Sequence, residues 1–228
     1  MTRGVFVTGT DTGVGKTIVA CALIHALRSA GLRVHPMKPV AAGAATHEGR
    51  LANEDTLALM AAAQLDAGAL ATVTPVLLRE PMAPHIAAAR EGRTISLEPI
   101  LAAFARATAG APFVVAEGVG GFAVPLGDDF DSIDLAHALG LPVILVVGMR
   151  LGCLNHALLT AAAIERSGLA FAGWIANMID PAMPVAGENI VALEKRLAAP
   201  LLGRLPHLVP PDPHALASHL DVRGLVSV

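Results

Sequence analysis

The sequence predicts an α/β fold: a doubly wound, mostly parallel sheet with helices on both faces, arranged as three layers. Short apolar runs bounded by Gly or Pro alternate with longer Ala- and Leu-rich segments of helical periodicity, as is typical of βαβ units. A Gly-rich stretch, "GTDTGVGKT", separates the first apolar run from the first helical segment. The chain has 228 residues, 54% of them hydrophobic, and no stretch that resembles a linker. We therefore expect one domain over residues 1–228.

The expected strands are short apolar runs, which are continuous rather than alternating because parallel strands are buried on both faces. They lie at residues 5–8, 34–38, 113–117, 143–147, 172–177 and 201–205. The expected helices lie at residues 16–30, 55–63, 97–109, 132–139, 154–167 and 188–198. Two further stretches, 40–55 and 73–88, are rich in Pro or Gly and long enough to be functional loops.

The composition favours small-molecule partners over nucleic acid or membrane. The formal net charge is −3, the pI is near 6.3, and Lys and Arg form no run. Glu117, Arg150 or glycines interrupt the apolar runs before they reach the roughly 20 residues of a membrane span. The chain enters "GVFVTG" without room for a signal peptide, so we expect a cytoplasmic location. Cys21 and Cys153 have no partner at metal-ligand spacing, and we expect both to be buried thiols.

Residues 9–17 are typical of a phosphate-binding loop. The glycines let the backbone approach a polyphosphate with its N–H groups, and the helix that starts near Lys16 presents its positive dipole end. Lys16 would bridge the β- and γ-phosphates, and Thr17 would place a hydroxyl on Mg²⁺. The common template, G-x-x-x-x-G-K-[ST], requires Gly where Thr10 stands, so the loop is one residue longer. The order of strand, loop, Gly-Lys-Thr and helix still predicts a fold of the P-loop NTPase type.

Lys38, Glu117 and Asn177 end three of the expected strands, and ligands bind at the carboxyl ends of the strands of an open parallel sheet. Glu117 either binds Mg²⁺ or accepts hydrogen bonds from the glycines that follow it. Asp55 either binds Mg²⁺ or, like Asn53, is the N-cap of the next helix. Lys38 either neutralises charge on a transferred phosphoryl group or is a surface lysine at a strand end.

Taken together, these motifs resemble the dethiobiotin synthetase family over nearly the whole chain. The resemblance is carried by "GTDTGVGKT", "KPVAAG", "NEDTLAL", "PHIAA", "VVAEGVGGFAVPL", "LPVILVVGMRLGCLNHALLT", "AGWIAN" and "PLLGRLP". In this family the phosphate loop has this longer form. The resemblance implies a ligase of biotin biosynthesis that uses ATP, Mg²⁺ and CO₂ to close a ureido ring on 7,8-diaminononanoate (7,8-diaminopelargonate). A carbamate forms on one amine and attacks the γ-phosphate, and the second amine then closes the ring and releases phosphate.

The resemblance also implies site residues and a homodimer. Lys38, Lys16 and Thr12 would be catalytic, and Thr17, Asp55 and Glu117 would hold Mg²⁺. The substrate would contact Thr12, Lys38 and Ala42, with its carboxylate near Gly152 and Asn155 at the subunit interface. ATP would be bound by Gly13, Val14, Gly15, Lys16, Thr17, Ile18, Asp55, Glu117, Gly118, Val119, Gly120, Asn177, Met178, Leu205, Pro206 and His207.

The sequence departs from the family pattern at three places. Family members often have Ser in the place of Ala42 and Glu in the place of Gly13, and some have Tyr near Asn189, whereas this chain has no Tyr. These departures concern the binding of the diamine rather than that of ATP. His85 in "PHIAA" matches the family, and we expect it to order a loop rather than to transfer protons.

Three other functions compete with this interpretation. A switch ATPase of the partition or septum-site class has a signature lysine in its loop, where this chain has Asp11. An amidase-type synthetase that acts on a corrinoid would need a glutaminase domain or a Cys–His nucleophile, and we find neither. A non-catalytic nucleotide-binding module is disfavoured because Lys38 and Glu117 are both expected to face the loop.

Overall fold

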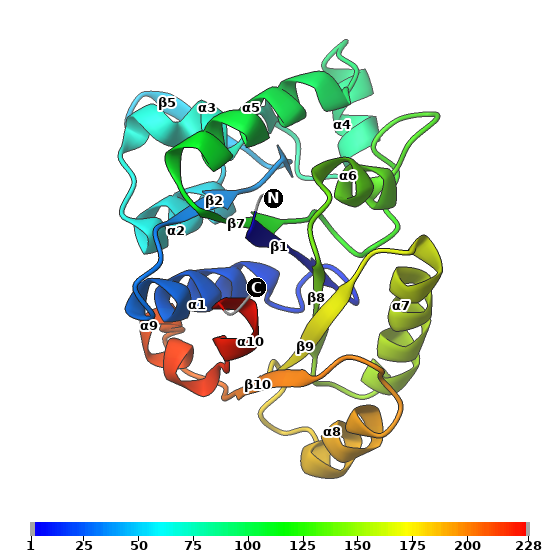
Figure 1. Ribbon diagram of the computed structural model, residues 1–228. Helices are drawn as coiled ribbons and strands as arrows, with labels where there is room; N and C mark the ends of the chain where they lie inside the picture. The colour runs from blue at the N-terminus through cyan, green and yellow to red at the C-terminus, as the bar shows by residue number, and fades with distance from the viewer. Residues whose placement is uncertain (1–2, 227–228) are drawn as a thin grey trace.

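The computed structural model describes residues 3–226, and its centre is a six-stranded sheet in which every pair of neighbours is parallel. The strand order is β10-β9-β8-β1-β7-β2 (Figure 1). The strands are β1 (Arg3–Gly9), β2 (Val34–Met37), β7 (Phe113–Glu117), β8 (Val143–Gly148), β9 (Phe171–Asn177) and β10 (Leu201–Leu205).

Helices cover both faces of this sheet and enclose two hydrophobic cores. Along β1, Val5 and Val7 pack into one core and Phe6 into the other, because successive side chains of a strand point to opposite faces. The first core is closed by α1 (Lys16–Ser29), α2 (Glu54–Ala63) and α9 (Pro213–Leu216). The second is closed by α4 (Pro84–Arg90), α5 (Leu97–Gly110), α6 (Ser132–Leu139), α7 (Cys153–Ser167) and α8 (Ala186–Glu194). The three-layer α/β prediction is confirmed.

The strand order brings together segments that are far apart in the sequence. After β1 and α1 the chain forms β2 at the sheet edge, and β7 later inserts between β1 and β2. The strands that follow β7 are added on the other side of β1, so the order reverses at this point, where open α/β sheets bind ligands. Val7 pairs with Glu117, and Met37 pairs with Ala116. Lys38, one residue past Met37, is therefore level with Glu117.

The two stretches expected to be functional loops contain small elements of their own. Within residues 40–55, β3 (Val40–Ala41) pairs with β6 (Val76–Leu77), and β4 (Ala45–His47) forms a hairpin with β5 (Arg50–Ala52). Both residues of the hairpin turn, Glu48 and Gly49, have positive φ, as the type I′ turn of a two-residue hairpin requires. These strands have only two or three residues, too few for a periodic signal. Residues 73–88 end in α4, which begins at Pro84.

The remaining differences from the expected elements lie mostly at their ends. The strand expected to end at Lys38 ends at Met37, because the Lys38 N–H leaves the ladder and donates to the Val73 carbonyl at 2.8 Å. The helix α8 runs from Ala186 to Glu194 rather than over residues 188–198. The other short elements are η1 (Ala67–Ala69), α3 (Leu70–Val73), η2 (Ala217–His219) and α10 (Arg223–Val226).

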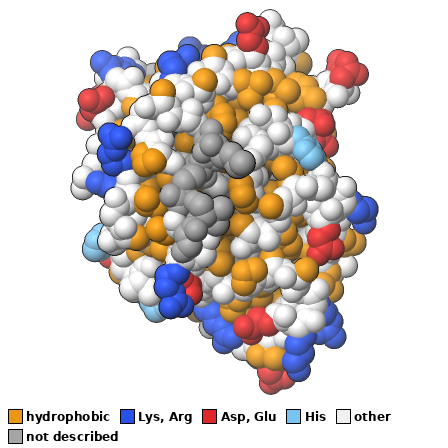
Figure 2. All heavy atoms as spheres, viewed as in Figure 1, with side chains coloured by type: hydrophobic (Ala, Val, Ile, Leu, Met, Phe, Trp, Pro, Cys, Tyr) orange, Lys and Arg blue, Asp and Glu red, His pale blue; other side chains and the backbone are white. Residues whose placement is uncertain are grey.

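The surface carries mixed charge. On the face shown in Figure 2, Lys and Arg side chains are scattered among acidic and apolar ones. Over residues 3–226, no helix combines the length and the apolar character needed to cross a membrane. Both cysteines, Cys21 and Cys153, are free and buried, as expected, and burial raises the pKa of the Cys21 thiol to about 12.

Candidate active site

The loop between β1 and α1 has the backbone form of an anion cradle. Gly13 and Gly15 have φ values of 75° and 85°, in the left-handed region that favours glycine. A Cβ at Gly15 would also collide with the side-chain nitrogen of Asn177. No side chain caps α1 and its first turn has no acidic residue, so its N–H groups are left for an anion.

Lys16 is folded back onto its own loop. Its Nζ donates to the Asp11 carbonyl at 2.9 Å, and the residue is only 7% exposed. Burial lowers the pKa of Lys16 to about 8, although the carboxylates of Glu117 and Asp55 oppose this shift. The Asp11 carbonyl accepts a hydrogen bond from the Lys16 ammonium here, and a bound phosphate would attract that ammonium more strongly.

Lys38 lies between two carboxylates. Its Nζ is 2.5 Å from Glu117 Oε1 and 2.9 Å from Asp55 Oδ2. Lys38 is 3% exposed and Glu117 1%, whereas the Asp55 side chain is 42% exposed. Burial alone would lower the pKa of Lys38, but Glu117 and Asp55 outweigh it and raise that pKa above its ordinary value. For Asp55, burial alone would raise the pKa, but Lys38 outweighs it and lowers that pKa below its ordinary value.

The same carboxylates offer oxygens that suit Mg²⁺. The Thr17 hydroxyl donates to Glu117 Oε1 at 2.9 Å, which places the loop hydroxyl beside this carboxylate. Glu117 Oε2 is buried and has no hydrogen-bond partner among residues 3–226. An unpartnered buried carboxylate oxygen is costly, and Mg²⁺ takes hard oxygen ligands. The hydroxyl of Thr17 and the carboxylates of Asp55 and Glu117 therefore fit a magnesium site.

The structure shows that Asn53, and not Asp55, caps α2. The Asn53 side chain accepts a hydrogen bond from the Asp55 N–H and is the N-cap of α2. Its amide nitrogen also lies 3.0 Å from the carbonyl oxygen of Ala42 and 3.4 Å from that of Gly43. Because Asn53 caps the helix, the Asp55 carboxylate is available for Lys38. Asn53 thus joins α2 to the segment that follows β2.

These groups face a cavity of about 830 Å³. Its polar lining residues are Asp11, Thr12, Lys16, Thr17, Lys38, Asn53, Asp55 and Glu117. Its apolar lining residues are Ala41, Ala42, Pro81, Met82, Ala83, Pro84, Val119 and Val124. Gly13, Gly15 and Gly120 also line it. The apolar residues come largely from the two stretches whose small elements were not predicted.

The residues expected at the adenine lie in a separate group beside the loop. The Asn177 side-chain amide nitrogen donates to the Val14 carbonyl at 2.9 Å, so Asn177 holds the phosphate loop against the end of β9. The Met178 N–H donates to the Leu205 carbonyl at 3.0 Å, and His207 Nδ1 is 3.2 Å from the Met178 carbonyl. Pro206 lies between Leu205 and His207 in the segment after β10. None of these residues lines the main cavity.

The other expected residues lie at helix or strand ends. Ile18 is in the first turn of α1, and Gly118 follows β7, where a Cβ would press against the Phe6 ring. Gly152 is the N-cap of α7 with φ 91°, and Asn155 lies exposed in the first turn of that helix. Neither Gly152 nor Asn155 lines the cavity within this chain.

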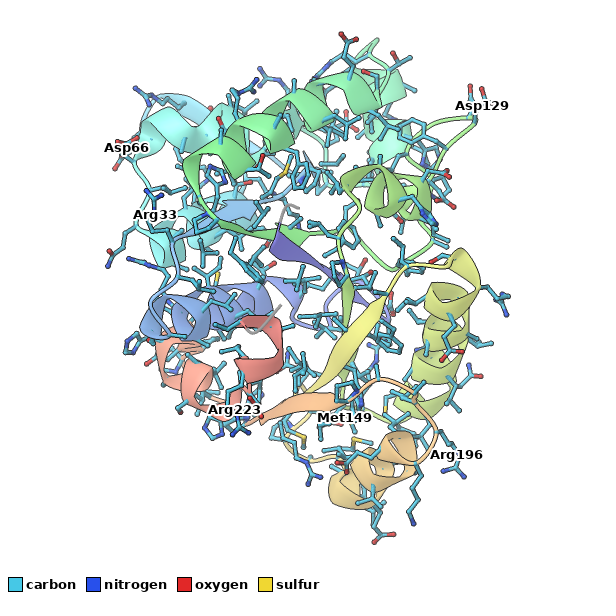
Figure 3. The ribbon with its side chains drawn as sticks, in the orientation of Figure 1. Arg33, Asp66, Asp129, Met149, Arg196 and Arg223 are labelled. Atoms are coloured by element: carbon cyan, nitrogen blue, oxygen red, sulfur yellow. The ribbon has the colours of Figure 1, made fainter. Side chains whose placement is uncertain are left out.

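Two contacts around the site had no sequence signal, and a third involves His85, which was expected to order a loop. Arg150 Nη2 donates to Asp11 Oδ2 at 2.8 Å, joining the segment after β8 to the phosphate loop. The neighbouring Met149, labelled in Figure 3, donates its N–H to the Asn177 carbonyl at 2.8 Å. His85 Nδ1 lies 3.1 Å from the Pro125 carbonyl, joining α4 to the loop after β7. Each contact depends on which elements pack side by side, which the local sequence does not specify.

Comparisons with known proteins agree on family and fold. Residues 3–214 match a family model described as an AAA domain. An ATP-dependent dethiobiotin synthetase, BioD, from Aromatoleum aromaticum is 56% identical over 222 residues, which cover 97% of this chain and 98% of that protein.

Two solved structures share the fold at low sequence identity. The septum site-determining protein MinD from Pyrococcus horikoshii, complexed with Mg-ADP, has a TM-score of 0.55 at 16% identity, covering 100% of this chain and 90% of that one. The signal recognition particle receptor FtsY from Elizabethkingia anophelis, in complex with GDP, has a TM-score of 0.53 at 13% identity, covering 99% and 61%. These two likenesses concern the fold alone. The full-length match at 56% identity goes further: this chain belongs to the family of ATP-dependent dethiobiotin synthetases.

Proposed function

We propose that this protein converts 7,8-diaminononanoate, CO₂ and ATP into dethiobiotin, ADP and phosphate, with Mg²⁺ as cofactor. One observation carries the proposal: the Lys38 ammonium lies between Asp55 and Glu117, beside the loop hydroxyl of Thr17. A phosphate cradle, a buried lysine and two carboxylates on one cavity suit phosphoryl transfer, which depends mainly on positioning and charge. As part of the same proposal, the enzyme is a single domain and acts in the cytoplasm.

ATP would bind along the phosphate loop. The backbone of residues 13–18 and the start of α1 would hold the phosphates, and Gly118, Val119 and Gly120 would lie beside them. Lys16 would leave the Asp11 carbonyl for the β- and γ-phosphates, whose charge would also favour its protonated form. The adenine would lie against Asn177, Met178, Leu205, Pro206 and His207.

Thr17, Asp55 and Glu117 would hold Mg²⁺, and the orphaned Oε2 of Glu117 supports this assignment. The cation supplies positive charge that offsets the charge of the triphosphate. Lys38 already places one positive charge between Asp55 and Glu117. Lys38 also lines the cavity, so its ammonium lies between these carboxylates and the space that the substrate would occupy.

The diamine would occupy the cavity beside the phosphate loop. Its amines would face Thr12 and Lys38, its methylene chain would pack on the apolar lining residues near Pro81, and Ala42 would contribute packing or its backbone. In the proposed homodimer, the substrate carboxylate would reach the helix start near Gly152 and Asn155 of the partner subunit. The exposed Leu151, at 94%, lies beside that helix start.

The reaction would proceed in three steps. One neutral amine attacks CO₂ and loses a proton, which gives a carbamate whose negative charge Lys38 stabilises. A carbamate oxygen then attacks the γ-phosphorus in line, forming a mixed carbamic–phosphoric anhydride and releasing ADP, with Lys16 and Lys38 stabilising the transferring phosphoryl group. The second amine attacks the carbamoyl carbon, the bond to phosphate breaks, and the amine proton leaves as the ring closes.

The test is product analysis by mass spectrometry after incubation with MgATP, bicarbonate and 7,8-diaminononanoate. A product one carbonyl heavier than the diamine and two hydrogens lighter is expected, in equal amount to the ADP released. ATP turnover should also depend on the diamine, whereas a switch ATPase would be indifferent to it. Absence of this product at saturating substrate would refute the proposal.

A further inference from the structure

Asp11 places a carboxylate inside a loop whose proposed ligand is a polyphosphate. A negative charge there would repel the phosphates. Asp11 nevertheless accepts three hydrogen bonds. Oδ1 accepts the Thr12 N–H at 2.7 Å, Oδ2 accepts Arg150 Nη2 at 2.8 Å, and the carbonyl accepts Lys16 Nζ at 2.9 Å.

Arg150 reaches this loop from an anchored segment. The preceding Met149 donates its N–H to the Asn177 carbonyl, and the Arg150 carbonyl accepts the Cys153 N–H at 3.0 Å. From the adjacent strand, Asn177 holds the Val14 carbonyl. The phosphate loop is thus supported at its start by Arg150 and at its middle by Asn177.

The Asp11–Arg150 pair is too exposed to serve mainly for folding. The side chain of Arg150 is 41% exposed and that of Asp11 48%, and ion pairs of this kind add little to stability. Arg150 does not line the main cavity, and its guanidinium donates to the Asp11 carboxylate. Its effect on the site therefore acts through Asp11.

We propose that Arg150 is a positioning residue for ATP: it cancels the Asp11 charge beside the triphosphate and fixes the turn at Thr12. This inference rests on the proposed function, since it takes ATP to be the ligand of the loop. The backbone hydrogen bond from Thr12, together with Arg150, lowers the pKa of Asp11, so the carboxylate is charged under working conditions. The neutral pair then leaves the N–H groups of the loop and the ammonium of Lys16 as the positive groups that face the phosphates.

The test measures ATP binding by calorimetry, independently of product formation, and then KM for ATP and kcat. Arg150→Met should weaken ATP binding and raise KM by about tenfold, with kcat within about twofold of wild type. Arg150→Lys should restore most of the affinity. Arg204→Met, which breaks a similarly exposed pair with Glu194 at 2.9 Å, is the matched control and should bind ATP as wild type does.

Two Asp11 variants separate charge compensation from direct contact. Asp11→Asn keeps an oxygen for the Thr12 N–H and removes the charge, so it should bind ATP at least as tightly as wild type. The double variant Asp11→Asn/Arg150→Met should bind ATP about fivefold or more tightly than Arg150→Met alone. Asp11→Asn also keeps the test decisive if Arg150→Met does not fold.

Three results would overturn the inference. A fall in kcat of Arg150→Met at unchanged KM would mean that Arg150 touches the transferring group. Charge compensation would be excluded if the double variant bound ATP as weakly as Arg150→Met does. It would also be excluded if Asp11→Asn bound ATP more weakly than wild type. If wild-type protein binds ATP but makes no dethiobiotin, the proposed function fails while the binding measurements still decide the role of Arg150.

Discussion

Replacing Lys38 with leucine should reduce turnover and stability together. The substitution removes the ammonium that lies 2.5 Å from Glu117 and 2.9 Å from Asp55. Removing one partner of a buried ion pair costs about 3–5 kcal/mol. We expect the lower end, about 3 kcal/mol, because Asp55 is partly exposed and contributes little. For a chain of this size that corresponds to a fall in Tm of roughly 6–12 °C.

Turnover should fall at least about a hundredfold, the effect of losing one charge-stabilising group. This corresponds to about 2.7 kcal/mol of transition-state stabilisation. ATP binding should remain largely intact. Mg²⁺ should narrow the difference in Tm between Lys38→Leu and wild type, because the cation would restore positive charge beside Glu117.

The measurements are thermal unfolding with and without Mg²⁺, ATP binding by calorimetry, and diamine-dependent release of ADP. Lys195→Leu is the matched control, since Lys195 is an exposed lysine at the end of α8. Wild-type turnover in Lys38→Leu would remove Lys38 from the mechanism. A Tm equal to that of wild type would refute the buried ion pair as described.

Three further predictions test other parts of the structure. Thr17→Val should weaken MgATP binding about tenfold and leave ATP binding in EDTA unchanged; equal MgATP affinity would count against the metal assignment. Asn53→Ala removes a helix cap and the bonds to two carbonyls, so urea unfolding should show a loss of about 1–3 kcal/mol, and a loss below about 0.5 kcal/mol would contradict it. The ring of His25 packs edge-on against that of His214, with 5.2 Å between the ring centroids. Burial, together with His214, lowers the pKa of His25 below 6.5. The unfolded chain then binds more protons in this range, so stability falls as the pH drops below about 6.5. His25→Gln should reduce that fall between about pH 7.5 and 5.5, and an unchanged pH dependence would show that His25 does not cause it.

Much of the fold could be predicted because its signals are local. Continuous apolar runs marked all six strands of the main sheet, and helical periodicity marked the six longest helices that cover it. The hairpin at residues 45–52 and the helix α4 were missed, since two or three residues carry no period and the Pro-rich context suggested a loop. Residues 41–42 and 81–84, which lie close to these elements, supply most of the apolar residues that line the cavity.

The candidate site was predictable residue by residue but not as an arrangement. The loop motif identified Lys16 and Thr17, and the strand ends identified Lys38 and Glu117. Whether Asp55 binds Mg²⁺ or caps a helix stayed open in the sequence, because either use needs only a carboxylate at a helix start. The roles assigned to these residues stay predictions until the variants are measured.

By itself, the sequence determined the elements, the phosphate loop and the family, because each depends on neighbouring residues or on their order along the chain. Only the tertiary structure decided the partners: Lys38 with Glu117 across 79 positions, Thr17 with Glu117 across 100, and Arg150 with Asp11 across 139. The physical reason is the strand order. Because β7 lies between β1 and β2, and β8 lies on the other side of β1, these side chains come together at the carboxyl ends of the strands.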